Sequence, residues 1–163
     1  MTLPFANEPE FHGTVNVVSS VKFGERVVVW QFATICHDVE IGNDVVIGSN
    51  VWIGAGTKIG DGTRIQHGAF IPNNTVIGRD VFIGPNVALT DDKYPRADWR
   101  VATPDRKLVP PVLEDRCALG AGCVILPGVV VGWHSTVGAG AVVTKHTLPG
   151  TTVVGCPAEL NKT

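Results

Sequence analysis

The sequence predicts an all-β solenoid built from six-residue repeats, and three features of its 163 residues predict it. A large apolar residue recurs at every sixth position, and a glycine often follows it directly. The fourth position after the apolar residue holds a small or β-branched residue. This period fits neither the 3.6 residues of a helical turn nor a strand alternation continued indefinitely. It fits a short strand followed by a tight corner, with successive coils stacked over one continuous core.

The large apolar positions set the register of the whole chain. Nine isoleucines follow one another at a spacing of six: Ile35, Ile41, Ile47, Ile53, Ile59, Ile65, Ile71, Ile77 and Ile83. The register extends back to Phe11 and forward to Leu89, and it resumes from Leu113 to Val143. Glycine follows in half of these repeats, which suits corners that need a positive φ or a close backbone approach.

The extent of the repeat and its interruption after Leu89 predict a single domain with five segments. We expect an N-terminal extension over 1–10, first coils over 11–89, a long excursion loop over about 90–112, final coils over 113–155 and a tail over 156–163.

Composition and charge exclude several classes of function. Hydrophobic residues make up 44% and charged residues 17%, so the chain is not of the disordered type. With 13 basic and 15 acidic residues and no basic run, it lacks the electrostatic footprint of a protein that binds nucleic acid or an anionic membrane. No signal peptide or apolar span is visible, and the cysteines have no CxxC spacing. We therefore expect a cytoplasmic protein whose Cys117 and Cys123 fill the core.

The main interruption of the repeat is the segment TDDKYPRADWRVATPDRKLVPPV, residues 90–112. It contains nine charged residues, four prolines and the only tyrosine of the chain. A loop of this length inside a compact repeat is usually either functional or disordered. A second irregularity lies at Gln66 and Pro72, which stand where the repeat expects glycine.

The pattern [Ile/Leu/Val]-Gly-x-x-[small]-x over residues 11–158 resembles the hexapeptide-repeat acyltransferase superfamily. This resemblance implies a left-handed parallel β-helix with three repeats to a triangular coil, and a homotrimer with active sites between subunits. Three repeats per coil would place His67 and Asn73 at neighbouring corners of one coil, with Asp91 stacked one coil above Asn73.

A narrower resemblance comes from RIQHGAFIPNNTVIGRDVFIGPNVALTDDKYPRA (residues 64–97), VWQFATI (29–35) and GAGAVVTK…VVGCPA (138–158). These segments are similar to the N-acetyltransferases that act on nucleotide-linked 3-amino sugars. The chain departs from that family at His67 and Asp91, where relatives often have Asn. It also has Glu159 where they often have a cation near the coenzyme A phosphate.

For the reaction, the resemblance implies acetyl transfer from acetyl-CoA to the amine of a UDP- or dTDP-linked amino sugar. Histidine is the side chain best suited to take the amine proton at neutral pH, and His67 lies at a break in the repeat. We therefore expect His67 to be the catalytic base and Asp91 to orient the imidazole or hold the substrate ammonium group. The expected substrate-binding residues are Gln66, Asn73, Tyr94 and Arg96. Arg96 suits a pyrophosphate, although a loop-anchoring ion pair is the competing interpretation.

The resemblance also implies a coenzyme A site along main-chain groups at Ala121, Gly138, Ala139 and Gly140, with Lys145 available to phosphate. No metal is expected. Trp30, Trp52 and Trp133 are expected between subunits, and Trp99 in the pocket.

Three alternatives stay open at this point. An O-acyltransferase acting on another small acceptor would use the same scaffold. A γ-type carbonic anhydrase shares the fold but needs three histidine ligands, and the corner residues His37 and His67 lie thirty positions apart with no H-x4-H motif. A non-catalytic β-helix scaffold would have little use for the polar loop.

Overall fold

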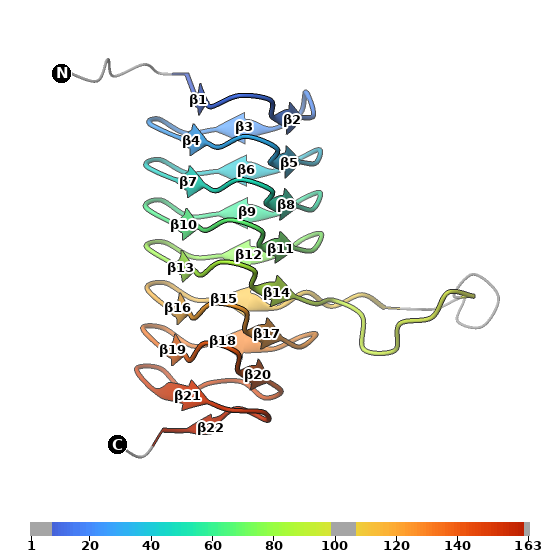
Figure 1. Ribbon diagram of the computed structural model, residues 1–163, viewed down its shortest axis with the longest axis vertical. Helices are drawn as coiled ribbons and strands as arrows, with labels where there is room; N and C mark the ends of the chain where they lie inside the picture. Colours follow the sequence, from blue (N-terminus) through green and yellow to red (C-terminus); the bar gives the residue numbers. More distant parts are fainter. Residues whose placement is uncertain (1–7, 99–106, 162–163) are drawn as a thin grey trace.

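In the computed structural model, which describes residues 8–98 and 107–161, the chain winds into a stack of triangular coils (Figure 1). From β1 it crosses the near side to β2 and returns through β3 at the back, moving down the stack with every turn, so the helix is left-handed. The described residues form strands and turns only, and no helix among them is long and apolar enough to cross a membrane. The predicted fold class is confirmed, and so is the handedness that the resemblance implied.

The strands form three sheets, and each successive strand of a coil belongs to the next sheet. Sheet A contains β1 (Glu10–Phe11), β4 (Val28–Val29), β7 (Val46–Ile47), β10 (Arg64–Ile65), β13 (Phe82–Ile83), β16 (Ala118–Leu119), β19 (Thr136–Val137), β21 (Thr152–Val154) and β22 (Glu159–Leu160). Sheet B contains β2 (Asn16–Val17), β5 (Thr34–Ile35), β8 (Trp52–Ile53), β11 (Phe70–Ile71), β14 (Ala88–Leu89), β17 (Val124–Ile125) and β20 (Val142–Val143). Sheet C contains β3 (Lys22–Phe23), β6 (Glu40–Ile41), β9 (Lys58–Ile59), β12 (Val76–Ile77), β15 (Val112–Leu113) and β18 (Val130–Val131).

The core is a column of the repeat residues. Ile47 pairs with Ile65, and Ile65 with Ile83, so one coil contains three repeats and like residues stack on like. These isoleucines are fully buried, as are Cys117 and Cys123 at the small position of the repeat. Burial raises the pKa of Cys117 to about 12 and that of Cys123 to about 11, which confirms both as core residues.

Side chains at the corners satisfy backbone groups of the coil before them. Asn43 accepts a hydrogen bond from the N–H of Glu25 at 2.8 Å, and Asp61 accepts one from the N–H of Asn43 at 2.7 Å. Asn73 does the same for Ala55 at 2.9 Å. This arrangement matters because a corner N–H has no strand partner and needs another acceptor.

The excursion loop begins where the ladder between coils fails. In an ordinary coil the N–H of Gly54 donates to the carbonyl of Ile71 at 2.8 Å. One coil later the equivalent residue is Pro72, which has no N–H, and β11 pairs with β14 through Phe70 and Ala88 only. Just beyond this point Thr90 still donates its N–H to the carbonyl of Ile125 at 3.0 Å, and the chain leaves the stack after it.

The return of the loop differs from the expected register in two ways. Val112 pairs with Val76 and is the first residue of β15, so the loop ends at residue 111. Val109 accepts the hydrogen bond from the N–H of Gly128 at this edge, so Val109 rather than Asp91 connects to the next coil. The stacking of Asp91 on Asn73 stays a prediction.

The end of the chain was expected to be a tail, but most of it is ordered structure. After Gly155, β22 folds back antiparallel to β21, with Val153 opposite Leu160. This reversed strand covers the lower edge of sheet A, so the exposed hydrogen-bonding groups of the last coil meet a partner.

The buried column gives a direct test of the fold. Ile53 is fully buried, so Ile53→Asp leaves a carboxylate among apolar side chains without a partner, and we expect a loss of several kcal/mol in the free energy of unfolding. The control Ile53→Val removes one methyl group and should cost about 0.5–1.5 kcal/mol. Urea unfolding followed by circular dichroism measures both, and equal effects of the two substitutions would contradict the inward orientation.

Candidate functional site

The expected site residues lie on two of the three edges of the prism. We call the turns that join sheet A to sheet B the AB edge, and those that join sheet B to sheet C the BC edge. Gln66, His67, Ala121 and the segment 138–140 lie along the AB edge, which faces the viewer in Figure 1. Asn73 and Lys145 lie on the BC edge, and Asp91, Tyr94 and Arg96 belong to the loop that leaves from it. One face of the prism, sheet B, separates the two groups.

His67 stands at the corner position that Asn and Asp occupy elsewhere in the chain. Its Nδ1 accepts a hydrogen bond from the backbone N–H of Ser49 at 2.8 Å. Its own carbonyl accepts from Asn86 at 2.9 Å, while the ring is exposed at the surface. The imidazole is thus anchored by one nitrogen and open to solvent on its other side.

Several backbone N–H groups of the AB edge are left without an acceptor. Within residues 8–98 and 107–161, those of His67, Ala121 and Ala139 donate no hydrogen bond. The next coil along the chain presents Pro85 to His67 and Ala139 to Ala121, and neither side chain can accept one. Ala121 and Ala139 are exposed, so this edge presents a row of free donors to a ligand.

A hollow of about 240 Å³ borders His67 on the side toward the N-terminus. It is lined by Trp30, Val46, Gly48, Ile65, Gln66 and His67. One face of the Trp30 ring is already covered by His12, whose ring stacks on it at 4.4 Å. His67 therefore divides the AB edge into an aromatic hollow above it and the row of free amides below it.

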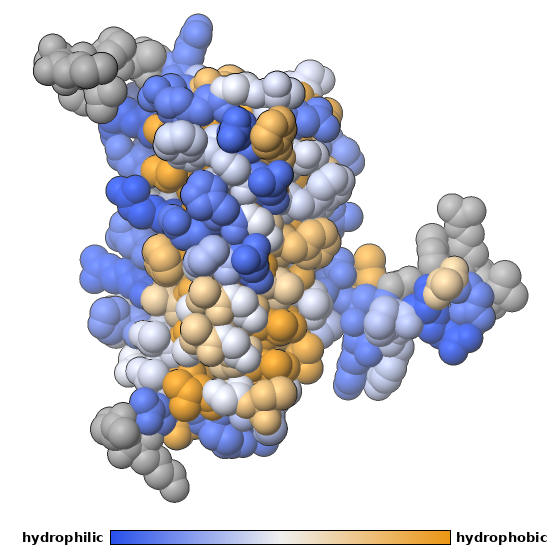
Figure 2. All heavy atoms as spheres, viewed as in Figure 1, coloured by the Kyte–Doolittle hydropathy of each residue, from blue (hydrophilic) through white to orange (hydrophobic). Residues whose placement is uncertain are grey.

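Apolar groups gather on the same side of the molecule. Figure 2 shows them over the lower, C-terminal half of the near face, whereas the upper half is more polar. In the coils that precede the loop, five further aromatic side chains on or beside sheets A and B are between 41% and 58% exposed: Trp30, Phe32, Trp52, Phe70 and Phe82. Such a concentration of exposed aromatic side chains is typical of a surface that meets another molecule.

On the BC edge and its loop, the expected residues differ in how many of their polar groups already have a partner. The carboxylate of Asp91 is half-buried and makes no hydrogen bond or ion pair within the described segments, although its carbonyl accepts from Val109 at 2.7 Å. Lys145 is exposed. Asn73 uses its side-chain oxygen to accept from Ala55 and keeps its amide nitrogen available.

In the loop itself, Arg96 binds the carboxylate of Asp98 through two nitrogens, at 2.7 and 2.9 Å. This pairing raises the pKa of Arg96 and lowers that of Asp98, but both groups are in water, where such a pair exchanges readily. The ammonium of Lys93 lies 5.5 Å from the centre of the Tyr94 ring, which is 70% exposed. Trp99 lies outside the described residues.

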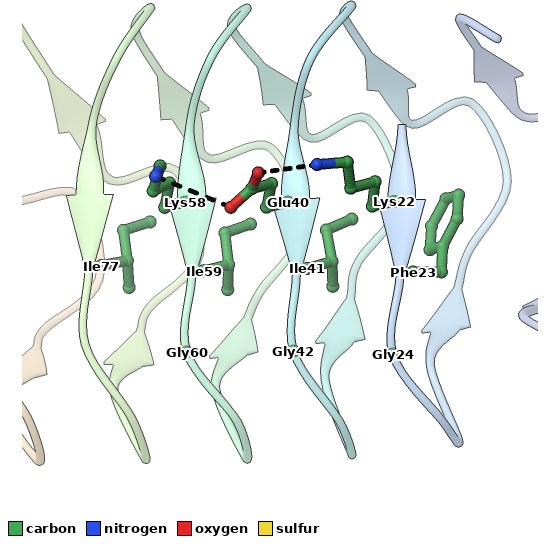
Figure 3. A pocket seen from close by; sticks show the side chains of 10 residues that line it. All are labelled: Lys22, Phe23, Gly24, Glu40, Ile41, Gly42, Lys58, Ile59, Gly60 and Ile77. Carbon is green, nitrogen blue, oxygen red and sulfur yellow. Dashed lines mark hydrogen bonds and ion pairs between the residues drawn. The ribbon is translucent and has the colours of Figure 1, made fainter. Parts of the chain in front are cut away.

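The hollow on sheet C is larger, about 560 Å³, but none of the expected site residues lines it (Figure 3). Across it, Glu40 pairs with Lys22 at 3.1 Å and with Lys58 at 3.7 Å. These contacts lower the pKa of Glu40. The three charges satisfy one another, so chemistry rather than size identifies the AB edge as the candidate site. No group of three or more metal-ligating side chains occurs within the described residues.

The roles of two contributors to the site were not predicted from the sequence. The three-repeat coil places Ser49 next to His67 but does not reveal the hydrogen bond by which its backbone anchors the ring. Trp30, expected at a subunit contact, lines the hollow beside His67. The spacing of 18 residues between Ser49 and His67 is the only signal that connects them.

Comparison with known proteins agrees with this architecture. The family described as bacterial transferase hexapeptide (six repeats) matches residues 20–55, 56–91 and 110–145, about two thirds of the chain. A hexapeptide-repeat acetyltransferase of Vibrio cholerae O1 biovar eltor, solved in complex with acetyl coenzyme A, superposes with a TM-score of 0.61 at 26% identity. The superposition covers 76% of this chain and 69% of that one.

Two curated relatives match over shorter segments. A putative acetyltransferase of Schizosaccharomyces pombe is 40% identical over 76 residues, which is 46% of this chain and 36% of the relative. A 2,3,4,5-tetrahydropyridine-2,6-dicarboxylate N-acetyltransferase of Staphylococcus aureus is 47% identical over 53 residues, 32% of this chain and 22% of the relative. The chain thus spans well under half the length of both.

The close stacking of the AB edge makes a testable prediction. A Cβ at Gly120 would lie 2.8 Å from the carbonyl carbon of Gly138, in the backbone of the next coil, so Gly120→Ala forces the corner at 138–140 to move. We expect a loss of about 1–3 kcal/mol in the free energy of unfolding.

The matched control is Gly140→Asn on the same edge. Nothing lies within 4 Å of a Cβ there, and Asn86 already has a φ of 56° at the equivalent position. Its thermal unfolding midpoint should stay close to that of the wild type. A Gly120→Ala protein as stable as the control would show that the coils are not in such close contact.

Proposed function

The chain belongs to the bacterial transferase hexapeptide family, and we propose that it is a coenzyme A-dependent N-acetyltransferase acting on a nucleotide-linked amino sugar. The observation that carries the proposal is the arrangement of the AB edge. His67 lies in line with the free backbone amides of Ala121 and Ala139. An acyl donor bound along these amides would bring its thioester to the imidazole.

The donor side of the proposal rests on shape and hydrogen bonding. Alanine and glycine at 121 and 138–140 leave room for a ligand chain close to the backbone, and the free N–H groups match the amide carbonyls of a pantetheine arm. The Vibrio cholerae protein with the same fold was solved with acetyl coenzyme A. Lys145 is exposed and available to a phosphate group, and we propose no metal in the reaction.

The acceptor side rests on the sequence resemblance over residues 64–97 and on the chemistry of the loop. Arg96 presents a guanidinium fork suited to a pyrophosphate, and a ligand phosphate would compete with Asp98 for it. Tyr94 has an exposed ring that a nucleobase can stack on. The half-buried carboxylate of Asp91 suits the ammonium form of the arriving amine, and Gln66 and Asn73 offer amides to the sugar hydroxyls.

We also propose a homotrimer with the site between subunits. The AB edge and the loop of one chain lie on different sides of sheet B, so one copy does not bring His67 to Asp91. A cyclic trimer would set the AB edge of one copy against the loop of the next. The exposed aromatic side chains of the AB edge would be covered there. We place the enzyme in the cytoplasm, where coenzyme A and nucleotide sugars are available, with no nucleic-acid or membrane partner.

A different acceptor is the second candidate function. The Staphylococcus aureus relative is named for an amine acceptor that is a dicarboxylate rather than a sugar, and an O-acyltransferase would use the same donor edge. We favour a nucleotide-linked acceptor because the loop residues Tyr94 and Arg96 suit a nucleobase and a pyrophosphate.

The direct test is release of free thiol from acetyl-CoA in the presence of UDP- and dTDP-linked 3-amino and 4-amino sugars. Turnover is expected with at least one of them, and Arg96→Ala should raise KM for that sugar more than it lowers kcat, because Arg96 grips a part of the substrate remote from the reaction. Turnover only with a dicarboxylate amine or a hydroxy sugar would replace the acceptor. No thiol release with any acceptor would refute the proposed enzyme class.

The shared site has its own test. His67→Ala and Arg96→Ala damage opposite halves of the site, so mixing the two denatured variants and refolding them together should restore about a quarter of the sites if copies assort at random. Each variant refolded alone serves as the control. Activity of the mixture no greater than the mean of the two controls would place both halves within one subunit.

A further inference from the structure

The hydrogen bond from Ser49 to His67 constrains the protonation of the imidazole. An N–H donor requires a ring nitrogen with a free lone pair, so Nδ1 carries no proton when it accepts from Ser49 at 2.8 Å. A flipped ring would point a C–H at the same N–H. The neutral ring therefore has its proton on Nε2, the nitrogen that is not held by the corner.

The rest of the chain supports this reading of the corner. The same position is filled by side-chain oxygens of Asn43, Asp61, Asn73 and Asp115, each of which accepts from a backbone N–H one coil earlier at 2.7–2.9 Å. Away from this corner position, His146 also accepts through Nδ1, from the N–H of Val130 in β18 at 2.9 Å. At the His67 corner the stacking of two coils sets the accepting atom as Nδ1, so its lone pair is already in use.

We propose that His67 acts as a hydrogen-bond donor through Nε2–H to the thioester carbonyl oxygen, and not as the base that takes the amine proton. This inference rests on the proposed acetyl transfer. A base at Nε2 needs the opposite tautomer, with the proton on Nδ1 facing the Ser49 N–H. That tautomer replaces a hydrogen bond by two opposed donors. A donor aimed at the developing oxyanion needs no such rearrangement.

The reaction balances without a protein base at this position. The neutral amine attacks the carbonyl carbon, a C–N bond forms, and the π electrons move to the oxygen that Nε2–H stabilises. When the intermediate collapses, the C–S bond breaks, and the proton lost by nitrogen passes through water to the departing sulfur. The products are the amide and the free thiol of coenzyme A. His67 keeps its proton throughout.

The first test measures the tautomer and needs no activity. In protein labelled with ¹⁵N-histidine, two-bond ¹⁵N–¹H spectra at a pH where the ring is neutral distinguish the two nitrogens, and His67→Gln assigns the signal. We expect an unprotonated Nδ1 and a protonated Nε2. A proton on Nδ1 would overturn the proposal, whether or not a substrate has been found.

The second test uses an isosteric pair once a substrate is known. Gln at position 67 is a donor that cannot act as a base, whereas Glu has the same length, can act as a base and cannot donate when ionised. We expect His67→Gln to lose less than about tenfold in kcat/KM and His67→Glu to lose about 10²–10³-fold. His67→Asn, which preserves acceptance from Ser49 as Asn73 does from Ala55, controls for the corner itself.

A base role predicts the opposite order. His67→Gln would then lose at least about 10²-fold and retain no more activity than His67→Glu. That result would overturn the donor assignment while leaving acetyl transfer intact. A wild-type protein that releases no thiol with any acceptor would refute the proposed function, and the tautomer measurement would still decide the state of the ring.

Discussion

The structure depends on the direct stacking of one coil on the next. Like residues must lie about 4.8 Å apart along three sheets at once, so every coil has the same length and the same corners. The apolar column of the repeat is one consequence, since Ile47, Ile65 and Ile83 can stack only when the register of 18 residues is kept. The glycine that follows about half of these apolar residues is another. At Gly120, for example, the backbone of the next coil occupies the space where a side chain would begin.

The same constraint creates the candidate site. Stacking leaves one corner N–H per edge and coil without a strand partner, and at five described corners an Asn, Asp or His side chain of the next coil accepts from it. Along the AB edge from His67 to Ala139 the chain offers proline or alanine instead, and the donors stay free. These exposed amides remain hydrated at little cost in a single chain, and a ligand with carbonyl groups can replace that water. The site is thus a stretch in which neither strands nor corner side chains use these N–H groups.

Much of the fold was predictable because its signal is periodic. The spacing of the isoleucines determines which side chains point inward, and the three-repeat coil implied by the resemblance then places His67 and Asn73 on neighbouring corners. A repeating pattern does not predict the effect of a single residue that departs from it. Pro72 lacks the N–H that would donate to Leu89, the chain leaves the stack after Thr90, and Val109 rather than Asp91 continues the BC edge. The sequence shows the proline but not the hydrogen bond that it removes.

The assignment of His67 illustrates the same limit at the level of chemistry. Residue type and position at a break in the repeat suggested a base, since histidine is the usual proton acceptor at neutral pH. The tautomer, however, is decided by the partner of Nδ1, and that partner is a backbone N–H one coil away. In a stacked helix the register of 18 residues sets this partner, because it places the N–H of Ser49 against the ring of His67 whatever reaction occurs at the surface. A histidine at this corner is therefore constrained first by the preceding coil, and the proton on Nε2 is what the fold leaves for a ligand.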